Sequence, residues 1–164
     1  MENLRQEAFT FLDTLLVHLN HDGINIDRFE MDHICYRIES MDNFYQKKLE
    51  WSSFTDQYHE GIVGGRPIAI LQLHEPWKYK EKEIPFIELP APKSNSFYPE
   101  GFEHAEFVID SSLPEFILKY PNLEFDKKGI SKTVNPDIRR KYKHLCVKFH
   151  CLSIDKVIAL ENQI

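Results

Sequence analysis

The feature that most constrains this chain is a repeated strand pattern. The segments that begin at Met31 and Phe102 each carry an acid followed directly by a histidine. In both, an aromatic residue lies three positions after the histidine and an isoleucine lies five positions after it. An acid six positions after the histidine and a serine seven positions after it complete each copy. The two matching histidines are His33 and His104. The second copy lies 71 residues after the first in a chain of 164 residues, and such an internal duplication predicts two copies of one supersecondary unit.

The first copy reads as a strand with two different faces. Its apolar side chains alternate along the segment and suit packing against a helix: Ile34, Tyr36 and Ile38. The opposite face carries groups that a hydrophobic core does not favour: His33, Cys35, Arg37 and Glu39. We therefore expect the polar face to line a site.

Composition indicates a protein of the cytoplasm. A formal net charge of −6 disfavours nucleic acid as a main partner, and the basic run at 139–143 is expected to be an exposed turn. Three cysteines without a CxxC pair predict neither a disulfide framework nor a structural zinc knuckle. We expect no signal peptide, because Glu2 and Glu7 interrupt the N-terminus, and no membrane span, because no apolar run approaches about 18 residues.

The periodicity predicts a single α+β domain over 1–164. An amphipathic helix within 1–22 precedes a first strand–helix–three-strand (βαβββ) module over 31–92, whose helix starts after Ser40 at 41–52. A second βαβββ module with a C-terminal helix occupies 101–164. In it, Ser112 to Glu115 form a capping box, strands are expected at 123–134 and 144–150, and the last helix follows Ser153.

The duplication also predicts a metal site. In each half, one candidate ligand lies on the first strand and one at the end of the last strand, which gives His33 with Glu88, and His104 with His150. Imidazole and carboxylate groups suit a divalent ion of the zinc, iron, manganese or nickel type. Asp32 precedes its histidine on the opposite strand face, as does the acid before His104, so neither acid is expected to be a ligand.

Further polar residues are candidates for binding or catalysis around that site. Arg37 or Lys148 could clamp the carboxylate or another oxyanion of a small molecule, and His74 lies on a face that could line the same cavity. Glu106 could act as a general base beside a metal-bound substrate.

Several motifs carry a family resemblance. The βαβββ repeat resembles the vicinal oxygen chelate superfamily, which includes glyoxalases, bleomycin-resistance proteins and extradiol dioxygenases. The closer resemblance is to the YecM-like family, and it rests on these segments: Asp32-His33-Ile34, Gly65-Arg66-Pro67-Ile68, Leu73-His74-Glu75-Pro76, Glu88-Leu89-Pro90, Glu103-His104-Ala105-Glu106 and Lys148-Phe149-His150. The resemblance implies paired modules that form an open barrel around a metal or ligand site, in a family without an assigned reaction.

One residue departs from the superfamily pattern. In glyoxalase-like members the final ligand is a carboxylate on the last strand, and here Glu161 would take that place if 157–161 formed the closing strand. The spacing of Ile154, Val157 and Ile158 favours a helix instead, and hence His150 as the ligand.

Three functions are compatible with the sequence. The first is a metal-dependent enzyme, either an isomerase, a lyase or an oxygenase, whose metal acts as a Lewis acid on an oxygen-bearing small molecule. The second is a metal-free module of the same fold that binds or sequesters a small ligand. The third is an interaction subunit whose N-terminal helix docks on a partner.

Overall fold

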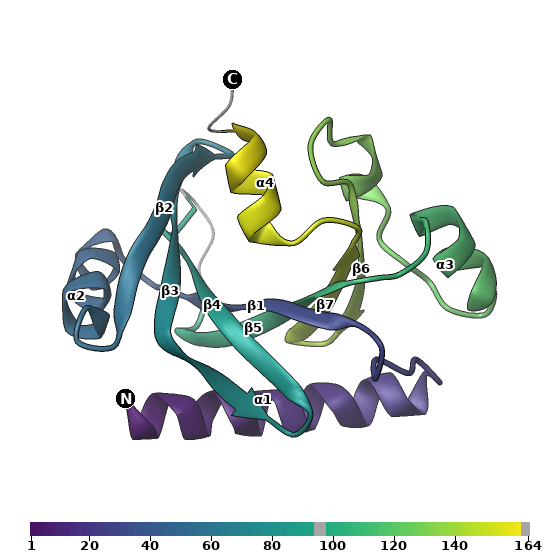
Figure 1. Cartoon of the computed structure of the whole chain (residues 1–164), viewed down its shortest axis with the longest axis horizontal. Coiled ribbons are helices and arrows are strands. Elements are labelled where there is room, and N and C mark those ends of the chain that lie inside the picture. Colours follow the sequence, from purple (N-terminus) through teal and green to yellow (C-terminus); the bar gives the residue numbers. More distant parts are fainter. Residues whose placement is uncertain (94–97, 162–164) are drawn as a thin grey trace. The chain divides into compact units, whose positions relative to one another are not determined.

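A computed structural model describes residues 1–93 and 98–161 (Figure 1). It confirms the predicted α+β class, with helices and a mixed set of parallel and antiparallel strands. The chain divides into two compact units. Unit 1 contains Met1–Phe9 and His33–Glu103, whereas unit 2 contains Thr10–Asp32 and the chain from His104 onward.

Unit 1 confirms the predicted βαβββ order. Its elements are β1 (Glu30–Arg37, which begins in unit 2), α2 (Met41–Trp51), β2 (Thr55–Val63), β3 (Arg66–Tyr79) and β4 (Lys82–Pro90). The strand order is β2-β3-β4-β1. Neighbours are antiparallel except β4 and β1, which run parallel.

Local sequence explains the boundaries of unit 1. The Ser40 side chain accepts a hydrogen bond from the Asn43 N–H and so caps α2, as predicted. Phe44 and Trp51 are the buried residues of α2, which runs alongside β2 in Figure 1. Gly64 and Gly65 have φ angles of 60° and 79°, a conformation that suits glycine and permits the tight β2–β3 turn.

Unit 2 has fewer strands than the sequence predicts. It contains the end of β5 (Gly101–Val108), then α3 (Leu113–Lys119), a short 3-10 helix η1 (Lys128–Ser131), β6 (Asp137–Tyr142), β7 (Leu145–His150) and α4 (Ile154–Glu161). β5 and β7 are parallel, and β6 and β7 are antiparallel. The last three residues predicted for this module, 162–164, lie outside the described residues.

Two sequence predictions in this region are wrong. Residues 123–134 were expected to be strand but contain η1 and one isolated bridge, Asp126 to Arg139. The segment approaches β6 closely at Gly129, where a Cβ would lie 2.4 Å from Asp137 Oδ1. The basic run at 139–143 was expected to be a turn, but most of it belongs to β6.

The helices follow their predicted patterns. α1 (Glu2–His21) buries the expected stripe, which consists of Ala8, Phe11, Leu12, Leu15 and Leu19. The capping box of Ser112 and Glu115 begins α3. Residues 154–161 are helical, which confirms the helix interpretation and places Glu161 at an exposed position rather than on a closing strand. Among the described residues, no helix is long and apolar enough to cross a membrane.

Candidate metal centre

The first predicted ligand pair comes together within unit 1. β1 and β4 run parallel with Cys35 opposite Glu88, so His33 and Glu88 lie on the same face of the two strands. His33 Nε2 lies 3.8 Å from Glu88 Oε2, and the two side chains are 2% and 15% exposed. A histidine that the sequence alone could place in solvent is therefore buried beside a carboxylate.

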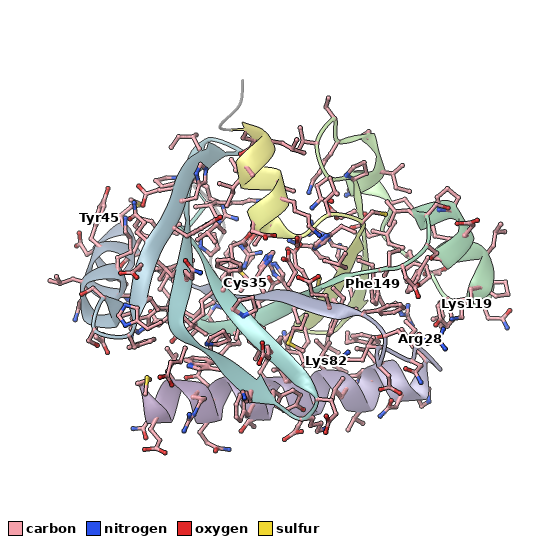
Figure 2. All side chains as sticks on the ribbon, viewed as in Figure 1. Arg28, Cys35, Tyr45, Lys82, Lys119 and Phe149 are labelled. Carbon is pink, nitrogen blue, oxygen red and sulfur yellow. The ribbon has the colours of Figure 1, made fainter. Side chains whose placement is uncertain are left out.

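Arg37 continues the same face of β1. Its Nε donates a hydrogen bond to Glu103 Oε2 over 3.0 Å, and its Nη2 forms an ion pair with the same oxygen at 2.9 Å. Burial acts to lower the pKa of Arg37, but the neighbouring Cys35, Glu103 and Glu88 raise it above its ordinary value, so the guanidinium stays charged. Figure 2 shows Cys35 in the interior, whereas Tyr45 projects outward from α2.

The second histidine is also buried beside a glutamate, within unit 2. His104 Nε2 lies 3.0 Å from Glu106 Oε1, and the two residues are 2% and 7% exposed. They stand two positions apart on β5 and therefore share a strand face. Lys148 lies opposite Glu106 on β7 and pairs with its carboxylate.

His150 lies on the far side of the same carboxylate. Its Nε2 is 3.3 Å from Glu106 Oε2 and 3.4 Å from Asp32 Oδ2, and its Nδ1 is 3.3 Å from the Asn135 amide nitrogen. The His150 side chain is 1% exposed. Glu106 thus contacts both predicted histidines of unit 2, one with each oxygen.

Asp32 has a role that sequence reasoning missed. The sequence predicts that Asp32 is not a ligand, because it lies on the opposite strand face from His33. In the structure Asp32 is buried, with 1% of its surface exposed. Its Oδ1 accepts a hydrogen bond from the Ile154 N–H over 2.8 Å at the start of α4, while its Oδ2 faces His150. The repeat could not reveal these contacts, because both partners come from the last 15 residues of the sequence, more than a hundred residues away from Asp32.

His74 lies apart from these pairs. Its side chain is 46% exposed, and its Nε2 lies 3.4 Å from Asp56 Oδ1. The β3–β4 register is interrupted between Gln72 and Trp77, so the face alternation that suggested His74 does not continue through it. Its assignment as a substrate-binding residue stays a prediction.

Histidine and acidic side chains that could hold a metal ion lie on β1, β4 and β5. Their donor atoms are imidazole nitrogens and carboxylate oxygens, which match the preferences of zinc, iron, manganese and nickel. Buried carboxylates are costly unless they are paired or bind a cation. The chemistry of these residues therefore fits the predicted cofactor.

Comparison with known proteins places the chain in a family. The family model described as YecM protein matches residues 1–132, which include both copies of the histidine repeat. The chain belongs to the YecM family. The predicted family resemblance is thus confirmed, and Lys148 and His150 lie beyond the matched segment.

Individual YecM relatives agree with this assignment. Protein YecM of Escherichia coli (strain K12) is 25% identical over 156 residues, which cover 85% of this chain and 82% of that protein. An uncharacterised protein of Haemophilus influenzae (strain ATCC 51907 / DSM 11121 / KW20 / Rd) is 27% identical over 156 residues, with 82% and 81% coverage.

Solved structures share the fold at lower identity. The structural genomics protein EC4020 has a TM-score of 0.83 at 23% identity and covers 98% of this chain and 92% of its own. The hypothetical protein BH1468 from Bacillus halodurans C-125 has a TM-score of 0.52 at 17% identity, with 77% and 96% coverage. Both support the fold.

Proposed function

We propose that this YecM-family chain binds a divalent metal ion through His33 and Glu88 of unit 1 together with His104 and Glu106 of unit 2. One observation carries the proposal. In each unit the histidine of the repeat is buried and directs its Nε2 at a glutamate. The two histidines occupy equivalent positions of the duplicated strand, whereas Glu88 is supplied by β4 and Glu106 by β5. Two imidazoles and two carboxylates form a donor set that suits one divalent ion.

The contacts of Glu106 favour it over His150 as the fourth ligand. Glu106 Oε1 lies 3.0 Å from the nitrogen of His104 that would bind the metal. His150 directs Nε2 at Asp32 and at the other oxygen of Glu106, which suits a residue that orients a ligand. The sequence favoured His150 as the ligand and Glu106 as a general base, and we propose instead that Glu106 is the ligand and that His150 orients it.

When bound, the metal would supply Lewis-acid polarisation of an oxygen on a small molecule. The surrounding residues of unit 2 would set the charge at Glu106. Lys148 pairs with the carboxylate and stabilises its ionised form, while His150 lies beside both Glu106 and Asp32 and orients the Glu106 carboxylate. Isomerase, lyase and oxygenase chemistry of the vicinal oxygen chelate type are all compatible with such a site, because fold does not select the reaction.

Metal content tests the proposal. Protein purified without chelator is expected to carry about one zinc, iron, manganese or nickel ion per chain by elemental analysis. His33→Ala and His104→Ala should each lose most of that metal while their circular dichroism stays that of the parent. His144→Ala is the matched control, since His144 is an exposed histidine in the β6–β7 turn, and it should retain the metal.

Equal metal content in the parent, both site variants and the control would refute the proposal. A parent that contains no metal and takes up none on dialysis against zinc or manganese would favour the metal-free alternative. In that case the same fold would serve as a module that binds or sequesters a small ligand.

A further inference from the structure

Two arginines share one face of unit 1 with the His33–Glu88 pair. Strand register places Cys35 opposite Glu88, and Glu88 opposite Ile70. Arg37 lies two residues after Cys35, and Arg66 lies four residues before Ile70, along strands in which alternate side chains point the same way. Both guanidinium groups therefore extend from the face that carries Glu88.

Each guanidinium retains a buried nitrogen without a hydrogen-bond partner among the described residues. Arg37 uses Nε and Nη2 for Glu103, and its Nη1 is buried and unpartnered. Arg66 donates from Nη1 to the Ala91 carbonyl over 2.5 Å, and its Nε is buried and unpartnered. Such orphaned donors cost stability, so two on one face indicate a place for an acceptor.

The charges on this face also call for an anion. Arg37 has Glu103 as a counter-ion, but Arg66 forms no ion pair with an acid of the described residues. Burial and then the charge of Arg37 lower the pKa of Arg66 below its ordinary value. The aromatic ring of Tyr98 covers Arg37, whose Cζ lies 5.0 Å from the ring centroid.

We propose that Arg37 and Arg66 bind the oxyanion end of a small molecule, either a carboxylate or a phosphate group. A guanidinium presents parallel N–H donors that match both groups, and the two unpartnered donors would be satisfied by its oxygens. Arg66 would then be a specificity residue of this site.

The same geometry limits the rest of the ligand. Successive side chains on one face of a strand are roughly 6.6 Å apart. Cys35, with Glu88 opposite it on β4, therefore lies between His33 and Arg37 along this face. The substrate class is therefore a small organic acid or phosphate ester with a second oxygen-bearing group at the His33 end. This second half of the inference rests on the proposed metal function, whereas the oxyanion site itself belongs to unit 1 alone.

Calorimetric titration with two probes tests the inference. Inorganic phosphate and acetate are titrated at constant ionic strength into the full-length parent, Arg66→Met, Arg66→Lys and Arg28→Met. The parent should bind at least one probe, and Arg66→Met should weaken that binding roughly tenfold or more, as expected for loss of a charged hydrogen bond. Arg66→Lys should retain part of the affinity. Arg28 is an exposed arginine (labelled in Figure 2), so the control variant Arg28→Met should bind the probes as the parent does.

The preferred probe identifies the ligand. Tighter phosphate binding indicates a phosphate ester, and tighter acetate binding indicates a carboxylic acid. A parent that binds neither probe would overturn the inference, as would equal losses in Arg66→Met and Arg28→Met. Metal content, measured on the same samples, separates the two proposals, because anion binding without any metal would contradict only the metal site.

Discussion

Asp32 illustrates how a single residue can join distant parts of the sequence. It is the first member of the repeated acid–histidine pair, and β1 places it next to His33 in the chain. Its carboxylate is shared between the N-terminus of α4 and His150. A negative charge at a helix N-terminus is favourable, and a buried acceptor with two partners fixes both of them.

Asp32→Ala should therefore lower the free energy of unfolding by about 1–3 kcal/mol, because it leaves the Ile154 N–H without its acceptor and His150 without its anion. Asp32→Asn keeps an acceptor for Ile154 and should lose less. Urea denaturation of the three proteins measures the difference. Equal stability of Asp32→Ala and the parent would show that these contacts do not contribute.

Strand β6 shows where sequence patterns fail at the scale of elements. Its basic side chains resemble a solvated turn, but Ile138 is fully buried and Arg140 and Tyr142 both donate to the carboxylate of Asp22, after the end of α1. That partner lies more than a hundred residues away, so no local window could contain it. The helices, in contrast, were predictable from local caps and apolar spacing, as Ser40 and Ser112 show.

The Asp22 contacts give stability that depends on pH. Burial acts to raise the pKa of Asp22, but the hydrogen bonds from Arg140 and Tyr142 and the charge of Arg140 hold it below its ordinary value. The ionised form is thus favoured in the folded state. Its contribution is complete above the unfolded pKa of about 3.9 and is lost as the pH falls through the lower folded pKa.

Asp22→Asn should accordingly destabilise the protein by about 1 kcal/mol at pH 7, and the difference from the parent should shrink as the pH falls below about 4. Thermal melts of both proteins between pH 2.5 and 7 provide the measurement. The other acids titrate equally in the two proteins, so their effects cancel in the stability difference. A difference that does not change with pH would contradict this account of Asp22.

At the scale of the whole molecule, the duplication made part of the candidate site predictable. His33 and Glu88 were paired from their strand positions alone, and unit 1 brings them together. The same reasoning found His104 and His150 but not the position of Glu106 between them, because side-chain contacts within a face depend on the register of β5 and β7. Arg66 belongs to a segment that carries the family resemblance, but nothing in that segment indicates that it shares a face with Glu88, because this depends on the register of β3 and β4.

The central claim is that the two histidine–glutamate pairs hold one metal ion. Diffraction at the zinc absorption edge from crystals of the full chain grown with zinc tests it most directly. The account predicts one anomalous peak per chain, about 2.0–2.2 Å from donor atoms of His33, Glu88, His104 and Glu106. Crystals grown with zinc that show no anomalous peak at these residues, or that show zinc bound only by other residues, would contradict the claim.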